Sequence, residues 1–366
     1  MTVEGGGDAE GQARRRTGSR RTGGPVKPLR LRDVAEVAGV SVTTVSVVLN
    51  SAPNSGIPPR TRDKVLQAAR ALGYVPDVAA QSLRTRRSRT LGFIADGIAS
   101  GPYAGQMITG AQAVAWKAGY VLLVVDTRDL EDLTEFAARV LLGRRVEGLI
   151  LGSEYNRAID VPPTLRAHDP TLADCVSRSG EHWAVIPDEV GGGYEATRRL
   201  LQREVGPVGF INLSKTIPAT AGRLKGYKAA LKEAGVRYDR SLVVNNESGR
   251  DAFEGYRLAG QMLDEHPGLR LLFCGNDRTA MGAYEAIKLR GLRIPEDIAV
   301  VGFDNQESIA DALIPGLTTV ALPHYEMGQR AAARALEVAA VHSQGKAAPP
   351  PEVQLAPCRL VERCSV

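Results

Sequence analysis

The sequence predicts a small all-α head followed by an α/β core of two doubly wound parallel-sheet units. Three short amphipathic helices, two of them joined through a glycine-containing turn, are expected between residues 29 and 75. From Thr90 onward, continuous apolar runs alternate with amphipathic helices, which indicates parallel sheets covered on both faces. Charge divides at the same place: residues 1–90 hold 16 Lys and Arg against 7 Asp and Glu, whereas the remainder holds 30 against 34. A basic head on a mildly acidic body is typical of a nucleic-acid-binding module joined to a second module.

The composition limits the class of protein. The 366-residue chain contains no run of about 18 apolar residues, so we expect no membrane-spanning helix. Residues 1–28 lack an apolar segment, which argues against a secretory signal and predicts a disordered basic tail on a cytoplasmic protein. The alternative explanation of that charge, a solvated basic tail without a partner, is less favoured. The four cysteines are scattered and the five histidines have no metal-ligand spacing, so reduced thiols, no metal and no cofactor are expected.

The head is expected at residues 29–75, in "LRDVAEVAGV", "SVTTVSVVLN" and "RTRDKVLQAARALGY". Gly39 and Gly73 end the first and third helices, and Ser41 offers an N-cap hydroxyl to the second. Apolar residues that recur at helical spacing are Val34, Ala35, Val37, Ala38, Val45, Val48, Leu49, Val65, Leu66, Ala69 and Leu72.

A hinge and linker are expected at residues 76–89, "PDVAAQSLRTRRSR". Pro76 and Asp77 suit a helix start, but a helix this short is marginal in water and needs a partner surface.

The core, residues 90–366, alternates strand and helix in two units arranged in tandem. "RTLGFIAD", "YVLLVVDT" and "VEGLILGS" are expected strands of the first unit, and "LRLLFCGND" and "DIAVVGFDN" are strands of the second. The segment from Tyr155 to Glu181 carries three prolines and interrupts the alternation.

Strand ends are where a ligand is expected, because open α/β sheets bind ligands outside the carboxyl ends of their strands. Asp96, Asn276 and Asp304 each stand where an apolar strand stops, and Arg223 opens a helix after "VGFINLS". Such groups suit a small polyol or sugar, although strand-end Asp and Asn also cap helices and form turns.

An enzyme has weaker support. "VGGGY", Gly191 to Gly193, could meet an anion but matches neither G-x-G-x-x-G nor the phosphate loop, and a tight turn capped by Asp188 or Glu189 is the favoured interpretation. No G-x-S-x-G or H-E-x-x-H motif is present, so no catalytic residue is predicted.

Residues 29–366 resemble the lac repressor family of bacterial transcription regulators. The head "LRDVAEVAGVSVTTVSVVLN" carries the resemblance together with "GRLKGYKAAL", "FCGNDRTAMGAYEAI", "RIPEDIAVVGFDN" and "LTTVALPHYEMGQRAA". The resemblance implies a helix-turn-helix head, a hinge helix and a core like periplasmic sugar-binding proteins, in which the chain crosses three times between interwoven subdomains.

The resemblance also implies an effector between the subdomains, contacted by Arg223, Asn276 and Asp304. Tyr103 in "GPYAG" stands where relatives often place an aromatic that stacks on the ligand, and Asp96 is a further contact. Gly101 and Ala104 depart from the "NPFF" that relatives often carry there.

Contacts to DNA are implied in two places. In the second helix, the resemblance places Val42, Thr43 and Val47 at base edges and Ser41, Thr44, Ser46 and Asn50 at phosphates. In the hinge helix, Asp77 to Thr85, Leu83 would wedge between base pairs in the minor groove and Ala80 would let two helices approach closely. Arg84, Arg86, Arg87 and Arg89 would neutralise phosphates.

The predicted function is a cytoplasmic, ligand-responsive repressor that binds a pseudo-palindromic DNA operator as a homodimer or tetramer, with a sugar as effector. Relatives often carry Arg where Val47 stands, so we expect an operator that differs at that base step. The alternatives are a solute-binding receptor, which the missing secretory signal disfavours, and an enzyme. Removal of residues 1–88 would separate them, since only a regulator loses DNA binding and keeps effector binding.

Overall fold

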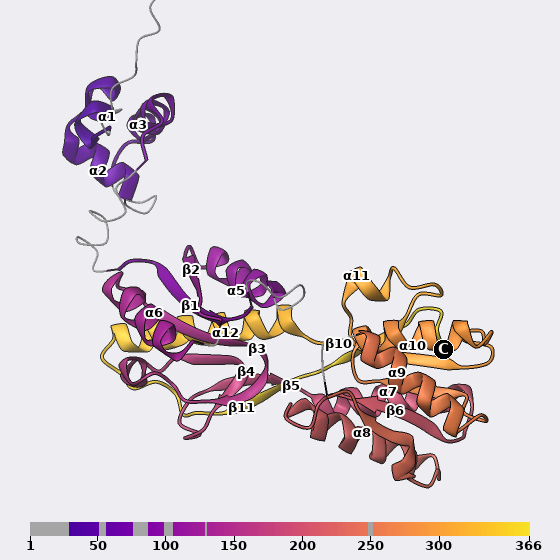
Figure 1. Ribbon diagram of the computed structural model, residues 1–366. Coiled ribbons are helices and arrows are strands. Elements are labelled where there is room, and N and C mark those ends of the chain that lie inside the picture. The colour runs from indigo at the N-terminus through magenta and orange to yellow at the C-terminus, as the bar shows by residue number, and fades with distance from the viewer. Residues whose placement is uncertain (1–28, 51–55, 76–86, 99–104, 129, 248–251) are drawn as a thin grey trace, which may run out of the picture. The chain divides into compact units, whose positions relative to one another are not determined.

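The computed structural model describes residues 29–50, 56–75, 87–98, 105–128, 130–247 and 252–366 (Figure 1). The chain divides into two compact units, Met1–Gln81 and Ser82–Val366, and each is considered by itself. Among the described residues, no helix combines the length and the apolar character that a membrane span requires.

The head is a bundle of α1 (Leu31–Ala38), α2 (Val42–Asn50) and α3 (Pro59–Leu72). Val34, Val45 and Val65, one from each helix, are fully buried and form its centre. Gly39 and Gly73 end α1 and α3 in the left-handed conformation, as predicted. Val37 departs from the expected apolar stripe, because its side chain is 59% exposed on α1.

The first sheet of the core has the strand order β11-β5-β4-β3-β1-β2, and every pairing in it is parallel. Its strands are β1 (Thr90–Asp96), β2 (Val121–Asp126), β3 (Gly148–Ile159), β4 (Thr171–Ser177), β5 (Ala184–Pro187) and β11 (Val353–Ala356). One core cluster joins α5 (Gly105–Lys117) and α12 (His324–Ser343) to the sheet. A second cluster joins α6 (Glu131–Gly143) and the 3₁₀ helix η1 (Pro163–His168) to it.

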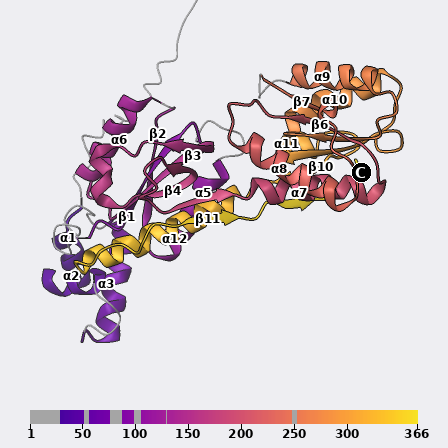
Figure 2. The same cartoon turned by 90° about the horizontal axis from the view of Figure 1, so that it is seen from below.

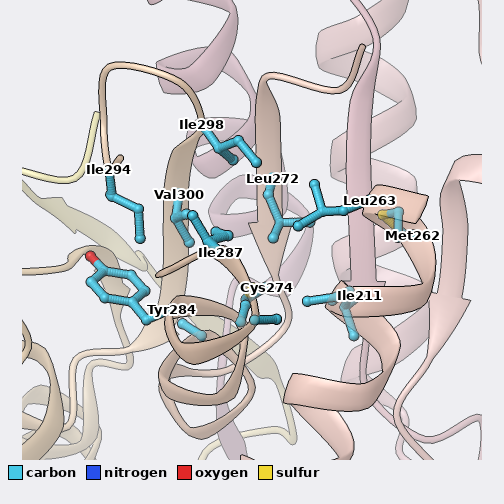
Figure 3. Close-up of a cluster of buried hydrophobic side chains, with 14 of the residues drawn as sticks. Ile211, Met262, Leu263, Leu272, Cys274, Tyr284, Ile287, Ile294, Ile298 and Val300 are labelled. Carbon is cyan, nitrogen blue, oxygen red and sulfur yellow. The ribbon is translucent and has the colours of Figure 1, made fainter. Parts of the chain in front are cut away.

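The second sheet has the order β12-β10-β9-β8-β6-β7, in which only β12 is antiparallel to its neighbour. Its strands are β6 (Val208–Asn212), β7 (Val243–Asn245), β8 (Leu271–Cys274), β9 (Ala299–Asp304), β10 (Thr318–Ala321) and β12 (Arg359–Val361), with the 3₁₀ helix η2 (Arg240–Leu242) before β7. The helices are α7 (Glu189–Arg203), α8 (Ala219–Glu233), α9 (Ala252–Glu265), α10 (Asp277–Leu289) and α11 (Glu307–Ala310). Figure 3 shows the core between the sheet and α9 and α10, to which Leu272, Tyr284 and Ile287 belong.

The two units of the core are interwoven rather than strictly in tandem. The chain leaves the first sheet after β5, returns with α12, and crosses once more between β11 and β12. Figure 2 shows α12, in yellow, alongside the much earlier strands of the first sheet, against which it packs. Two parallel sheets covered by helices, with a helical head, confirm the predicted fold class.

Two local expectations have different outcomes. The proline-containing segment from Tyr155 to Glu181 interrupts the alternation of strands and α-helices, as predicted, because it holds the end of β3, η1 and β4 and no α-helix. The expectation that the apolar run of β2 is covered on both faces is wrong, since β2 is an edge strand that leaves Val121 57% exposed.

Glycines set the spacing of the helix pairs that cover the sheets. In the pair α5 and α12, a Cβ at Gly328 would overlap the carbonyl oxygen of Met107, and one at Gly110 would overlap that of Tyr325. In the pair α9 and α10, a Cβ at Gly282 would overlap the carbonyl oxygen of Ala252. These helices therefore pack backbone to backbone, and a larger residue at such positions has to push them apart.

We expect Gly328→Ala to lower the free energy of unfolding by about 1–3 kcal/mol or more, because the neighbouring backbone cannot yield as a side-chain tip can. Urea unfolding of the full chain, followed by circular dichroism, measures the change. Gly143→Ala is the control, since open space surrounds that helical position and the substitution should leave stability unchanged or raise it by up to about 1 kcal/mol. Equal stability of the two variants would contradict the tight crossing.

Candidate functional site

A cavity of about 210 Å³ in the core collects polar side chains from both sheets. Arg223, Asn276 and Asp304 all line it, so the structure brings together three of the five expected effector contacts. The full lining consists of Glu154, Tyr155, Asn156, Asp174, Glu189, Leu213, Ile217, Ala219, Arg223, Asn276, Asp304 and Leu322. Four of these residues are acidic, and Arg223 is the one basic residue among them.

Arg223 is buried at the base of this cavity, with 2% of its surface exposed. Its Nε and Nη2 donate to the two carboxylate oxygens of Glu189, at 2.7 and 3.3 Å, and its Nη1 donates to the carbonyl oxygen of Gly275. Nη2 also lies 3.5 Å from Oδ1 of Asp304, and the guanidinium carbon lies 3.6 Å from the centre of the Phe303 ring. Burial acts to lower the pKa of Arg223, but Glu189 and Asp304 outweigh burial and raise it, so the group stays charged.

Asp304 and Asn276 stand at strand ends, where the sequence predicts them. Asp304 has a φ of 102°, a strained value for a residue other than glycine, and its Oδ2 accepts a hydrogen bond of 3.2 Å from Gln306 Nε2. Burial raises the pKa of Asp304 to about 6, although Arg223 acts to lower it. Asn276 caps α10, because its Oδ1 accepts from the backbone N–H of Thr279 at 2.8 Å.

A bulge in β3 forms the opposite wall. The pairing of β3 with β4 shifts between Gly152 and Arg157, and the residues inside that shift include Glu154, Tyr155 and Asn156 of the cavity lining. Beside the bulge, Asp174 of β4 is 2% exposed with a φ of 56°. Its Oδ2 lies 3.6 Å from Nε2 of the buried His324.

Three acidic groups of the cavity, Glu154, Asp174 and Glu189, were not predicted as ligand contacts. The strand-end rule does not find Asp174, because this residue lies in the middle of β4, where the pairing with β3 shifts. Nothing in the sequence signals that Glu189 pairs with Arg223, because the pair forms only when α7 and α8 pack together.

Asp96 does not share this cavity. It forms an ion pair with Arg157, and both line a separate cavity of about 500 Å³ beside α6 and η1 of the first sheet. Asp96 therefore does not join the other expected effector contacts in this structure. Its carboxylate is instead paired with Arg157, at the end of the β3 bulge. Tyr103 lies outside the described residues.

The glycines of "VGGGY" serve packing. Oδ1 of Asp188 accepts from the Gly191 N–H at 2.8 Å, so Asp188 caps α7 and the glycines lie in the helix rather than in a tight turn. A Cβ at Gly192 would come within 2.6 Å of the Phe303 ring, and one at Gly193 would overlap the backbone of Arg223. These two positions let α7 approach the buried guanidinium closely.

In the head, α2 exposes its first turn. Oγ of Ser41 accepts from the backbone N–H of Thr44 at 3.1 Å, so the predicted N-cap is confirmed. Val42, an apolar residue, is 46% exposed beside the exposed Thr43. Ser46 and Val47 are half-buried on the same helix. The side chain of Asn50, and the hinge residues Ala80 and Leu83, lie outside what the structure describes.

The end of the linker is fixed to the core. The Arg87 guanidinium donates to the Tyr120 hydroxyl at 2.6 Å and pairs with Glu147 at 3.1 Å, and that same carboxylate accepts from the Tyr120 hydroxyl. The backbone N–H of Arg89 donates to the other oxygen of Glu147 at 2.7 Å. Arg87 is therefore paired within the core, which disfavours its expected role at phosphates; Arg84 and Arg86 lie outside the described residues.

Behind the cavity, Asp277 is fully buried at the start of α10. Its Oδ2 accepts from the Gln306 N–H at 2.7 Å, and its Oδ1 accepts from the Thr319 hydroxyl at 2.6 Å. Burial, aided by the nearby carboxylate of Asp304, raises the pKa of Asp277 to about 8 in spite of these donors. This carboxyl group therefore holds its proton across the weakly acidic and neutral range.

Two family models match the chain. Residues 30–77 match bacterial regulatory proteins of the lacI family, and residues 197–366 match the periplasmic binding protein-like domain. The first match covers the three helices of the head, and the second covers all six strands of the second sheet together with α12 and β11.

Individual relatives match over most of the chain. The sucrose operon repressor of Escherichia coli is 33% identical over 342 residues, which are 92% of this chain and 99% of the relative. The transcriptional regulator DegA of Bacillus subtilis is 33% identical over 308 residues, 81% of this chain and 87% of the relative. Among solved structures, the lac repressor dimer bound to operator and the anti-inducer ONPF has a TM-score of 0.70 at 26% identity, over 93% and 99% of the two chains. The complex of the regulator CelR with cellobiose has a TM-score of 0.62 at 26% identity, over 92% and 100%.

The raised pKa of Asp277 predicts how stability depends on pH. The unfolded carboxyl group titrates near pH 4 and the folded one near pH 8, so the folded state binds more protons between these values. The free energy of unfolding should therefore fall as the pH rises from about 5 to about 8, and Asp277→Asn should reduce this slope. Urea unfolding across that range measures it. Asp297→Asn, which removes a half-buried carboxyl with a pKa lowered to about 2, should leave the slope intact. An unchanged slope in Asp277→Asn would assign the titration to another group.

Proposed function

The chain belongs to the lacI family of bacterial regulatory proteins, and from this premise we propose that it represses transcription by binding a pseudo-palindromic operator as a homodimer, under the control of a small effector. A transcription regulator binds DNA and catalyses no reaction, so the enzyme and the solute-receptor alternatives are set aside. We place its action in the cytoplasm, where an operator is accessible.

The observation that carries the proposal is the exposed first turn of α2. Hydroxyl groups of Ser41 and Thr44 lie at a helix N-terminus, where backbone N–H groups and the helix dipole favour a phosphate. Val42 exposes an apolar surface beside them, as contact with a thymine methyl group requires. We propose base contacts by Val42, Thr43 and Val47, and phosphate contacts by Ser41, Thr44, Ser46 and Asn50. The minor-groove roles of Ala80 and Leu83 remain part of this proposal.

Exposed apolar side chains in both α/β units of the core support a homodimer. Trp116 of α5 is 64% exposed near the exposed edge strand β2, and Phe253 of α9 and Ile314 after α11 are 68% and 79% exposed. Large apolar side chains on several elements are typical of a protein interface. The lac repressor, which the chain resembles along most of its length, is a dimer on its operator.

We propose that the effector is a small carbohydrate bound by Arg223, Asn276 and Asp304 in the cavity between the sheets. The named relatives include a sucrose operon repressor and a regulator solved with cellobiose. Because the cavity lining comes from both sheets, a ligand there favours one arrangement of the sheets over another and alters DNA affinity. A hundredfold change in affinity requires about 2.7 kcal/mol of differential binding, which a few charge-assisted hydrogen bonds supply.

We expect the full chain to select a pseudo-palindromic duplex from a randomised pool and to bind it with a steep dependence on salt. Between 50 and 200 mM salt the affinity should fall on the order of 10³-fold, because the basic residues displace counterions from phosphates. Electrophoretic mobility shifts or fluorescence anisotropy measure the slope. Selection of no sequence, or an affinity insensitive to salt, would count against operator binding.

We expect Val47→Arg to change the base preferred at one step of each half-site toward guanine, with a discrimination of about 1–3 kcal/mol, because Arg binds guanine through two hydrogen bonds. Repeating the selection with the variant measures the change. Val37→Arg is the matched control: it adds the same charge at an exposed position of α1, so it should alter overall affinity and leave the base preference unchanged. An unchanged preference in Val47→Arg would remove Val47 from base contact.

A further inference from the structure

We propose that the effector of the cavity between the sheets carries a basic nitrogen, as an amino sugar or amino polyol does, and that the Asp174 carboxylate binds it. The inference rests on the proposed function, since it concerns the ligand of the same cavity and specifies that this ligand is positively charged. Three observations support it: the guanidinium of Arg223 is already paired, the cavity lining has an excess of acidic residues, and one carboxylate oxygen of Asp174 lacks a donor.

Arg223 is not open to an anionic ligand. Each nitrogen of its guanidinium already faces an acceptor of the protein: Nε and Nη2 face Glu189, Nη1 faces the Gly275 carbonyl, and Nη2 also faces Asp304. The Phe303 ring covers one face of the group at 3.6 Å. A phosphate or carboxylate that binds the guanidinium through two N–H groups would have to compete with Glu189 or Asp304 for this buried charge, which is costly.

The remaining lining is acidic. Glu154, Asp174, Glu189 and Asp304 line the cavity, and Arg223 alone opposes them among the described lining residues. Four carboxyl groups and one guanidinium leave an excess of three acidic groups around a small, partly enclosed space. Arg157, which also belongs to the β3 bulge region, directs its guanidinium to Asp96 at the other cavity. Such a lining repels an anion and attracts a cation, because charges interact more strongly away from bulk water.

The basic group of the ligand is expected to bind at Asp174. Its side chain is 2% exposed, and its Oδ1 has no hydrogen-bond partner among the residues that the structure describes. Its Oδ2 lies 3.6 Å from Nε2 of His324, beyond the range of a normal hydrogen bond. A buried carboxylate oxygen without a donor is costly, and a ligand N–H that reaches it removes that cost. An ammonium group satisfies the oxygen and also cancels part of the negative charge, whereas a hydroxyl group does only the first.

The strained backbone of Asp174 agrees with a binding role. Its φ of 56° lies in the left-handed region, which residues other than glycine rarely adopt. The bulge of β3 beside it carries Glu154, Tyr155 and Asn156 into the lining, so the local irregularity of both strands serves to form this wall.

Matched ligands test the proposal on the full chain. Calorimetric titration with gluco-, galacto- and manno-configured sugars compares each neutral parent with its 2-amino, 6-amino and ring-nitrogen analogues and with its 6-phosphate. We expect at least one basic analogue to bind about tenfold or more tightly than its parent, and the phosphates not to bind. Asp174→Asn should abolish the preference for the basic analogue, while Asp160→Asn, an exposed carboxylate outside this cavity, should retain it.

Other outcomes overturn the inference. Neutral parents that bind as tightly as their basic analogues would contradict a charged contact at Asp174. Binding of a phosphate, failure of every basic analogue, or an unchanged preference in Asp174→Asn also contradicts it. Thermal unfolding of Asp174→Asn verifies its fold, and the wild-type comparison of parent with basic analogue decides the matter without the variant. Duplex binding of the same preparation without sugar is measured in parallel, so a regulator with a different effector is distinguished from a protein that does not bind DNA.

Discussion

The cavity and the helices around it depend on one buried ionic group, the guanidinium of Arg223. It joins the start of α7 through Glu189, the end of β8 through the Gly275 carbonyl, and the end of β9 through Asp304. A buried charge is tolerated only when its partners are placed accurately, so the positions of these three elements are coupled. Gly193 belongs to the same arrangement, because a side chain there would separate α7 from the backbone of Arg223. A ligand that contacts Asp304 or Glu189 therefore acts on a connected unit of the second sheet.

Sequence patterns predicted the structure correctly where it depends on residues close together in the chain. The head helices, their glycine ends and the Ser41 cap follow from helical spacing and capping chemistry. The alternation of apolar runs with helices likewise predicted two parallel sheets. β4 escaped prediction because Asp174 and the preceding prolines break its apolar pattern, and of these residues Asp174 belongs to the wall of the cavity.

Pairing between distant residues could not be predicted. Arg223, Asn276 and Asp304 were identified as strand-end groups, but the sequence does not indicate that Glu189 holds Arg223 or that Arg157 holds Asp96. The apolar run of β2 suggests a buried strand, and only the sheet order places it at an edge. The first sheet also holds the end of the linker, because Glu147 and Tyr120 bind Arg87. Any movement of the chain around Tyr120 and Glu147, just before β2 and β3, therefore moves residue 87 with it.

Residues 353–361 supply an edge strand to each sheet, β11 to the first and β12 to the second. During synthesis neither sheet can be completed until this segment has left the ribosome, although the head has been available since about residue 75. At ~5–20 residues per second the interval is roughly 15 to 60 s. For that time a nascent chain can carry a folded head while its core is unfinished and exposes apolar strands. Newly made chains thus gain DNA-binding helices before they can respond to any effector, and correct assembly of the core depends on protection from aggregation in the meantime.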